Sequence, residues 1–250
     1  MAYKGLIDFC SIPPTELISL TEQALWLDVE NQQGDGFTGA NSLIIHMMAT
    51  AIMMREGAEF FPELSPALLD LFFLIGWLHD WGKKMVKMSL LGKIGKLSLE
   101  EIAEIHRHTT LEYVVEAYQQ SGIDPDSIPP YILEACTHHH KDLDGGGYPE
   151  EIILPERIYI STLLLMGVDR FEAGTSHMRP WQPPEEPEEL LRKLEKDASD
   201  GKLCALSVGA IRSHGRRVEL TDFPRIVETI AAKTDKKRFN YDLEIPLVGL

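Results

Sequence analysis

Leu78-His79-Asp80-Trp81-Gly82-Lys83 is the stretch from which the fold and chemistry of this chain are interpreted. It closes the apolar segment Ala67 to Leu78, which predicts a buried helix ending at the His-Asp pair. The imidazole offers a nitrogen ligand, and the carboxylate can bridge two cations. A His-Asp pair alone is more often a surface or capping pair, so a metal hypothesis depends on the other histidines and carboxylates of the chain.

Helical periodicity extends over most of the sequence. Ser98 and Glu101 form a capping-box pattern, and Ser65-Pro66 is typical of a helix start. Gly-rich stretches at 34–39 and 142–149 predict loops, and the lysine-rich stretch 83–96 predicts a solvated connector. No segment shows the alternation typical of strands. The sequence therefore predicts an all-α, single-domain helical bundle with helices near 15–30, 42–55, 66–78, 99–120, 131–140, 156–168, 188–198 and 224–233.

Composition limits the function classes. The chain has 250 residues, 44% of them hydrophobic, and a net charge of −15, which argues against binding duplex nucleic acid. Cys10, Cys136 and Cys204 are too few and too widely spaced for a disulfide framework and fit a reducing cytoplasm. The sequence shows no signal-peptide pattern at the N-terminus, and its longest apolar runs are too short to cross a membrane. We therefore expect a cytoplasmic protein that is not bound to a membrane.

Candidate metal ligands recur on separate predicted helices, as in helical bundles that bind metals in their cores. A lone histidine such as His46 is usually a hydrogen-bonded core residue. In this chain, however, His46 is one of several candidate ligands. The full set is too large for one ion with an open position and suits two ions bridged by Asp80, a device that hydrolyses phosphate esters. Mixed imidazole and carboxylate ligands favour iron or manganese, with zinc as the alternative. The candidate ligands are His46, His79, Asp80, His108, His139, His140 and Asp169.

The motifs and their order resemble the HD-GYP subgroup of HD-domain phosphohydrolases. After the His-Asp stretch come Leu97–Glu101 leading to His108-Thr109, then His139-His140-Lys141 and Asp144-Gly145-Gly146-Gly147-Tyr148-Pro149, then Arg157-Ile158, Val168-Asp169 and Arg179-Pro180. The paired histidines followed by Asp-Gly-x-Gly-Tyr-Pro are the most specific mark. The resemblance covers residues 42–182, which we expect to be the catalytic core, with 1–41 as a helical flank and 183–250 as C-terminal helices and a tail packed on the same domain.

The resemblance implies a bundle of about seven helices and metal-dependent hydrolysis of cyclic di-GMP, a bacterial second messenger, to linear pGpG or GMP. It implies that the seven candidate residues are metal ligands, that Asp80 bridges the ions, and that a shared hydroxide attacks phosphorus. Asp80 and Lys83 would be catalytic, and Lys83 and Arg179 would contact the substrate's phosphates. Gly147, Tyr148 and Pro149 resemble a surface that meets partner proteins, often diguanylate cyclase domains.

Several positions depart from the family pattern. Ser42 lies one turn before His46, where some members have a Glu that holds a third metal, so we expect two ions. Lys141 and Gln182 replace a Glu and a basic residue, and the remaining departures are Glu112 for Gly and Trp181 for Tyr.

Two alternatives to a cyclic di-GMP phosphodiesterase remain. One is a catalytically weak or inactive module that binds a partner protein or a cyclic dinucleotide, which Lys141 and Gln182 mildly favour. The other is a phosphohydrolase acting on another nucleotide, such as cyclic GMP-AMP. The complete ligand set favours an active enzyme.

Overall fold

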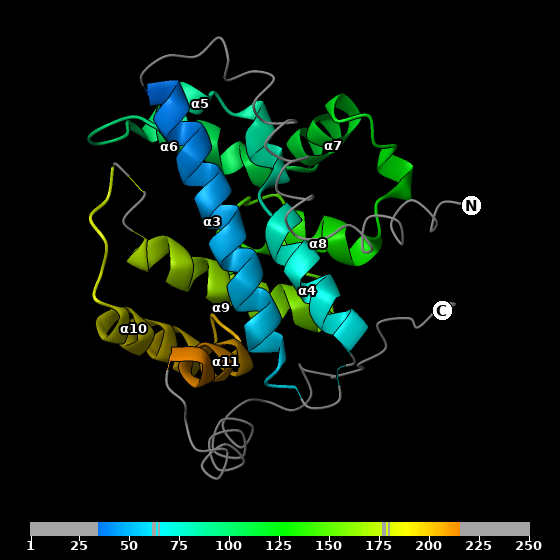
Figure 1. The fold of residues 1–250 in the computed structure, drawn as a ribbon, viewed down its shortest axis with the longest axis vertical. Coiled ribbons are helices and arrows are strands. Elements are labelled where there is room, and N and C mark those ends of the chain that lie inside the picture. The colour runs from blue at the N-terminus through cyan, green and yellow to red at the C-terminus, as the bar shows by residue number, and fades with distance from the viewer. Residues whose placement is uncertain (1–34, 62–63, 65, 177–178, 180, 216–250) are drawn as a thin grey trace.

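Helix α3 (Asp35–Ala58) is the element on which the other helices assemble, and it crosses the front of the bundle in Figure 1. The computed structural model describes residues 35–61, 64, 66–176, 179 and 181–215. Leu43, Met47, Ala51 and Met54 recur at helical spacing and are all buried. This apolar stripe holds α3 in the core, where it packs against α4, α5, α9 and α11.

The close crossing of α3 and α4 (Pro66–Leu78) positions the His-Asp pair. A Cβ atom added at Gly76 would lie only 2.7 Å from the Cα atom of Ala51. The two backbones approach this closely because both residues are small. The C-terminal end of α4, and with it His79, is thereby brought beside His46 of α3.

The elements that follow α4 range from single 3-10 turns to the 16-residue helix α9. In Figure 1, α5 to α7 lie toward one end of the bundle and α9 to α11 toward the other. The helices and 3-10 turns that follow α4 are η2 (Trp81–Met85), α5 (Met88–Leu91), α6 (Leu99–His106), η3 (Arg107–Thr109), α7 (Leu111–Gln120), η4 (Pro125–Ser127), α8 (Pro130–His138), α9 (Ile160–Thr175), α10 (Pro187–Ser199) and α11 (Ala205–Gly215).

The prediction of an all-α protein is confirmed, because the described residues contain no strand and only one isolated bridge, between Lys141 and Gly147. The loop expected at 34–39 was wrong, since α3 begins at Asp35 and continues through its two glycines. The predicted helices at 15–30 and 224–233 and the predicted tail lie outside the described residues.

The single long helix expected over 99–120 was also wrong. The chain breaks at η3, and the Thr110 side chain accepts a hydrogen bond from the backbone N–H of Tyr113 to start α7. A β-branched residue with a hydroxyl is well suited to such a cap. The capping box of Ser98 and Glu101 at the start of α6 is present as predicted.

Helices α9, α10 and α11 belong to the same core as α3 and α4. Leu164 and Met166 of α9, Leu194 of α10 and Ile211 of α11 all lie in one buried apolar cluster. The sequence prediction placed α9 too early, at 156–168, and missed α11 altogether. Short helices without a strong apolar stripe are difficult to identify because tertiary packing stabilises them more than their own propensity does.

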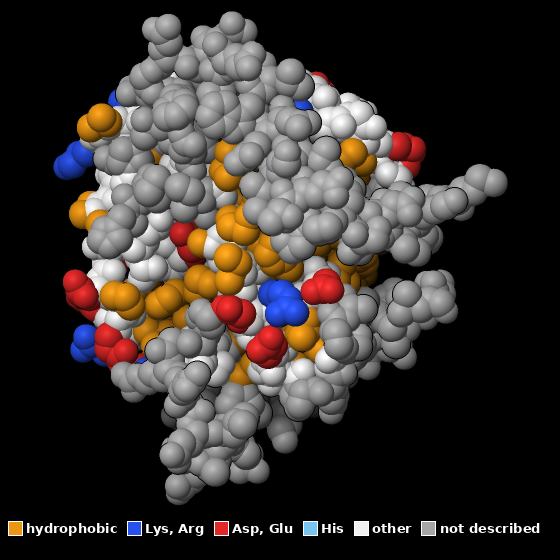
Figure 2. Space-filling model, viewed as in Figure 1, with side chains coloured by type: hydrophobic (Ala, Val, Ile, Leu, Met, Phe, Trp, Pro, Cys, Tyr) orange, Lys and Arg blue, Asp and Glu red, His pale blue; other side chains and the backbone are white. Residues whose placement is uncertain are grey.

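Apolar side chains also reach the surface. On the face seen in Figure 2 they gather near the centre, with acidic and basic side chains around them, and Ile52 of α3 is 43% exposed. Within the described ranges, none of the helices combines the length and the apolar character needed to cross a membrane.

Candidate metal centre and adjoining pocket

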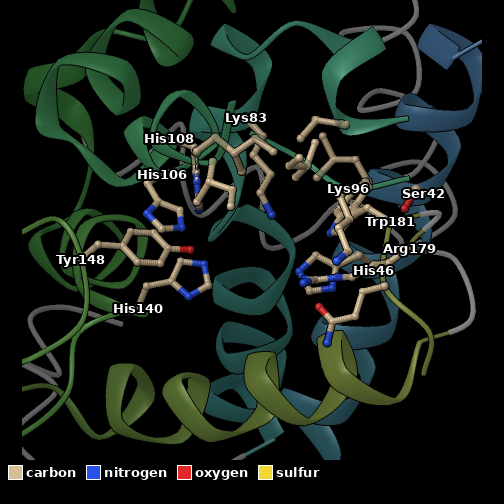
Figure 3. A pocket seen from close by; sticks show the side chains of 16 residues that line it. Ser42, His46, Lys83, Lys96, His106, His108, His140, Tyr148, Arg179 and Trp181 are labelled. Atoms are coloured by element: carbon tan, nitrogen blue, oxygen red, sulfur yellow. Dashed lines mark hydrogen bonds between the residues drawn. The ribbon is translucent and has the colours of Figure 1, made fainter. Parts of the chain in front are cut away.

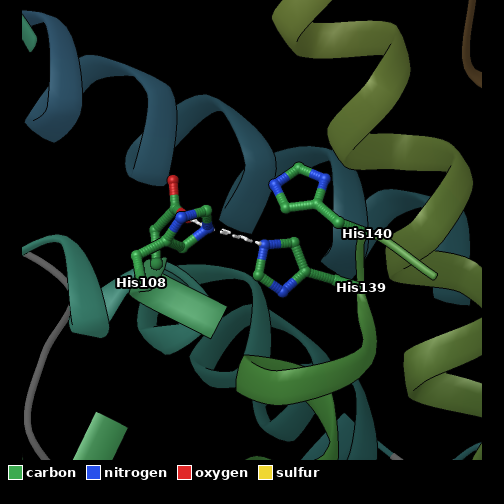
Figure 4. A group of neighbouring side chains, drawn as sticks. His108, His139 and His140 are labelled. Atoms are coloured by element: carbon green, nitrogen blue, oxygen red, sulfur yellow. Dashed lines mark hydrogen bonds and ion pairs between the residues drawn. The ribbon is translucent and has the colours of Figure 1, made fainter. Parts of the chain in front are cut away.

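The candidate ligands converge in the interior of the bundle although they come from five separate segments. They form two groups, and within each group the ligand atoms lie within 4.8 Å of one another. One group is Asp80, His108, His139 and His140, and the other is His46, His79 and Asp169. Figure 4 shows the histidines of the first group, with His108 approaching from the side opposite His139 and His140. All seven predicted residues are therefore brought together, and their role as ligands remains a prediction.

Asp80 lies between the two groups. Its Oδ1 atom is 3.1 Å from Nε2 of His108 and 3.6 Å from Nε2 of His139. Its Oδ2 atom is 3.1 Å from Nε2 of His46 and 3.4 Å from Nε2 of His79. The two oxygens of one carboxylate thus face different ligand groups, which is the arrangement that a bridging carboxylate requires.

Backbone carbonyls fix which nitrogen of each ring is available. The Nδ1 atom of His79 lies 2.7 Å from the carbonyl oxygen of Gly76. The Nδ1 atom of His108 lies 2.6 Å from the carbonyl oxygen of Ile105, and that of His139 lies 2.8 Å from the carbonyl oxygen of Ala135. Because a carbonyl oxygen only accepts hydrogen bonds, these Nδ1 atoms carry the proton and donate it. In the neutral form of each ring the metal-binding lone pair is therefore on Nε2. Burial acts to lower the pKa of His79, but Asp80 and Asp169 outweigh it and raise that pKa, so a metal ion at this Nε2 atom competes with a proton.

In His46, a carboxylate instead of a backbone carbonyl accepts the hydrogen bond from Nδ1. Its Nδ1 atom donates to Oε2 of Glu172, a residue of α9 that is only 7% exposed. The sequence analysis did not identify Glu172. Glu172 follows Asp169 by three residues, and such residues share a face of a helix, but the predicted helix 156–168 ended before both of them.

The surroundings of the two groups favour different protonation states. Burial lowers the pKa of His108 to about 4 and also lowers the pKa values of His139 and His140, so these rings are neutral near neutral pH. Burial also acts to lower the pKa of His46, but Asp169, Asp80 and Glu172 outweigh it and raise that pKa to about 10. The His46 group is thus built to hold positive charge, which a proton or a metal ion can supply.

The carboxylates fit the same interpretation. Burial alone would raise the pKa of Asp80, but the Lys83 ammonium and the neighbouring histidines hold it well below its usual range. Both oxygens of Asp169 and Oδ1 of Asp80 are buried and accept no hydrogen bond of good geometry from the described residues. Histidine nitrogens face two of them at 3.1 Å, a contact that satisfies the carboxylates only when the rings are protonated or share a cation with them. Buried carboxylate oxygens without partners are costly unless a cation balances them, so the donor set fits divalent metal ions.

Lys83 lies in η2, buried beside the two groups. Its ammonium group donates to Oδ2 of Asp80, and its side chain lines the pocket that leads to the metal centre. The turn of η2 packs tightly against η3, because a Cβ atom at Gly82 would lie 2.0 Å from the His108 carbonyl oxygen. Glycine at this position lets the segments carrying Lys83 and His108 meet.

A pocket of about 460 Å³ opens beside the centre and is shown in Figure 3. This volume is within the range of sites that bind small molecules. Its apolar lining is Leu43, Leu91, Leu97, Ile102 and Ile105, and its polar and aromatic lining is Ser42, His46, Lys83, Lys96, His106, His108, His140, Tyr148, Arg179, Trp181 and Gln182. Arg179, predicted to contact substrate, therefore lies in the same pocket as Lys83.

Three stacked rings form one wall of this pocket. Tyr148 lies between His106 and His140, with ring centroids 3.6 Å from the first and 4.5 Å from the second. The sequence analysis assigned Tyr148 to a partner surface and gave His106 no role. The stack joins the Gly-Tyr-Pro loop to the metal centre through His140.

The loop itself is held by Lys141, a residue that departs from the family pattern. Lys141 is 2% exposed, and its ammonium group donates to the carbonyl oxygens of Gly145 and Pro149 at 3.3 and 3.2 Å. Of the three predicted partner-surface residues, Gly147 is exposed, Tyr148 lines the pocket and Pro149 is buried.

His138 belongs to neither ligand group. Its Nδ1 atom lies 3.1 Å from the Glu134 carbonyl oxygen and 2.7 Å from the Thr137 hydroxyl.

Comparison with known proteins identifies relatives but no family model that matches the chain. A cyclic di-GMP phosphodiesterase of Pseudomonas aeruginosa is 32% identical over 156 residues, covering 60% of this chain and 34% of the relative. A cyclic di-GMP phosphodiesterase of Thermotoga maritima is 35% identical over 132 residues, covering 52% and 33%. A 3'3'-cGAMP-specific phosphodiesterase of Vibrio cholerae is 36% identical over 149 residues, covering 58% and 27%.

The matched segment spans between about a quarter and a third of the length of these relatives, namely 34%, 33% and 27% in the order given. The similarity therefore concerns one part of each relative.

Proposed function

We propose that the chain hydrolyses a phosphodiester bond of a cyclic dinucleotide. Its similarity to cyclic di-GMP and 3'3'-cGAMP phosphodiesterases and the HD-GYP motifs of its sequence support this proposal. The observation that carries the proposal is the position of Asp80, whose two oxygens face two separate groups of metal ligands. An adjacent pair of ions is a recurring arrangement in enzymes that hydrolyse phosphate esters.

In this proposal the seven ligands hold two divalent ions, with Asp80 bridging them. When bound, the ions supply Lewis-acid activation of water and of the phosphoryl group. Iron or manganese suits the mixture of imidazole and carboxylate donors, and zinc is the alternative. The Nδ1 atoms of His79, His108 and His139 are held by backbone carbonyls, and this contact orients the Nε2 atom of each ring toward the ligand group.

Lys83 is proposed to act on the scissile phosphate. Its ammonium group is buried beside Asp80 and reaches the pocket, so it can offset the negative charge that develops on the phosphoryl oxygens. Arg179 would hold a phosphate further from the metal centre. The apolar lining and the three stacked rings offer flat surfaces for the bases.

Cyclic di-GMP is the proposed substrate, with pGpG or GMP as product. Relatives named for both cyclic di-GMP and cyclic GMP-AMP make the second dinucleotide the nearest alternative. The test is incubation of the metal-loaded chain, prepared without oxygen, with each dinucleotide, followed by chromatography of the products and metal analysis of the same sample. Binding of cyclic di-GMP without turnover by a fully loaded chain would favour the inactive binding module instead.

We further propose that residues 42–182 are the catalytic core and that the C-terminal helices belong to the same domain, since α11 packs on α3 and α9. A protein partner, such as a diguanylate cyclase domain, would meet the Gly-Tyr-Pro loop at its exposed residues, 144–147. A pull-down with the chain carrying Asp144→Lys, compared with the unaltered chain, tests that contact.

A further inference from the structure

Lys96 lies in the loop between α5 and α6 and lines the pocket together with Arg179 and Gln182. The sequence predicted a solvated connector here. In Figure 3, Lys96, Arg179 and Trp181 are grouped on one side of the view and His106, Tyr148 and His140 on the other, with Lys83 between them. In this view Lys96 and Arg179 lie on the same side of the pocket, near His46 and away from the stack of His106, Tyr148 and His140.

The loop that carries Lys96 is anchored at both ends. Glu101 of α6 accepts hydrogen bonds from the Lys93 ammonium group at 2.6 Å and from the backbone N–H of Ser98 at 2.7 Å. Gly95 has a φ of +96°, a backbone conformation that favours glycine, directly before Lys96. These contacts fix the backbone at Lys96 although its side chain is exposed.

The charge of Lys96 is available for a ligand. Among the residues that the structure describes, neither Lys96 nor Arg179 has a carboxylate partner, whereas Lys83 is bonded to Asp80 and Lys93 to Glu101. In a chain with a net charge of −15, an anionic ligand is attracted only where cations are gathered locally. Lys96 and Arg179, which line one pocket and have no carboxylate partner among the described residues, form such a place.

A cyclic dinucleotide carries two phosphodiester groups, each with one negative charge. Only one of them can be at the metal centre during cleavage, so the other needs a separate cationic partner. The family pattern has a basic residue at position 182, where this chain has the neutral Gln182. Gln182 lines the same pocket as Lys96, which comes from a different part of the sequence.

We propose that Lys96 binds the second, non-scissile phosphodiester together with Arg179 and supplies the positive charge that Gln182 lacks. This inference rests on the proposed function. It assigns Lys96 a role in substrate affinity and gives it no part in the chemical step.

The test is the split between KM and kcat for cyclic di-GMP, measured on the full chain. Lys96→Ala should raise KM roughly tenfold, the scale of one charge-assisted hydrogen bond, with a much smaller change in kcat. Lys87→Ala is the matched control, because Lys87 is an exposed lysine of the same connector that does not line the pocket. The KM for bis(p-nitrophenyl) phosphate, which has a single phosphodiester, should rise less than the KM for cyclic di-GMP.

Charge restoration gives a second readout. Lys96→Arg should retain most of the affinity, and Gln182→Lys added to Lys96→Ala should recover it. A KM for Lys96→Ala equal to that of Lys87→Ala would overturn the inference while leaving the proposed function standing. If the loaded chain cleaves neither diester, the proposed function fails, and calorimetric binding of cyclic di-GMP to the same variants then decides the role of Lys96 by the same comparison.

Discussion

Replacing Glu172 by Gln should weaken the binding of one metal ion and leave the binding of the other unchanged. Glu172 accepts the Nδ1 proton of His46, whose Nε2 atom faces Asp80 and Asp169 at 3.1 Å each. Glutamine can still accept this hydrogen bond through its carbonyl oxygen, so the ring keeps its orientation while one buried negative charge is lost. The substitution therefore tests the charge separately from the geometry.

Loss of such an outer partner of a ligating histidine typically costs 10- to 100-fold in metal affinity, about 1.4 to 2.7 kcal/mol. Because Glu172 contacts only His46 among the ligands, the loss should be confined to the group of His46, His79 and Asp169. The group of Asp80, His108, His139 and His140 should bind its ion as before.

The assay is titration of the metal-free chain with Mn²⁺ or Zn²⁺, followed by calorimetry and by metal analysis after gel filtration. The wild-type chain should bind two ions, and Glu172→Gln should bind the first normally and the second 10- to 100-fold more weakly. Glu189→Gln is the control, because it removes the same charge at an exposed residue of α10 that belongs to neither ligand group. Equal affinities in Glu172→Gln and wild type, or an equal loss at both ions, would refute the reasoning.

Three further predictions follow from the same centre. Asp80→Asn should lose metal and turnover while circular dichroism reports an intact fold, and full metal content with normal turnover would exclude a bridging role. Lys83→Ala should keep its metal and slow turnover by roughly 10²-fold or more, the scale of one preorganised electrostatic group; unchanged turnover would leave Lys83 without a catalytic role. Metal loading near neutral pH should release a proton from His46, because its pKa of about 10 keeps the ring protonated in the metal-free chain. His108, with a pKa of about 4, should release none. Calorimetry in buffers of different ionisation enthalpy measures the number of protons released per ion bound. This number should fall as the pH rises toward 10, and a constant number would contradict the assignment of the released proton to His46.

The helical class of the chain was predictable because it depends on local patterns. The stripe of Leu43, Met47, Ala51 and Met54 and the capping box of Ser98 and Glu101 are encoded within a few turns of sequence, and the structure contains both. The break at η3 was not predictable in this way. The N-cap at Thr110 competes with helix continuation, and the close contact between Gly82 and His108 exists only after the two segments meet.

The candidate ligands were also named from the sequence, since histidines and carboxylates in the order of a known family suffice to select them. Their roles follow from contacts that no local pattern contains. Glu172 lies 126 positions from His46 along the chain, and Lys96 reaches the pocket wall formed by Arg179 and Gln182.

The sequence by itself therefore determined the helical class and the set of metal-binding candidates, because residue type and short spacing are local properties. The tertiary structure alone decided which oxygen of Asp80 faces which histidines, which carboxylate orients His46 and which lysines of the connector line the pocket. The physical reason is that these distances depend on how α3, α4, α8 and α9 cross. Those crossings are set by the packing of side chains from distant parts of the chain, such as Gly76 against Ala51.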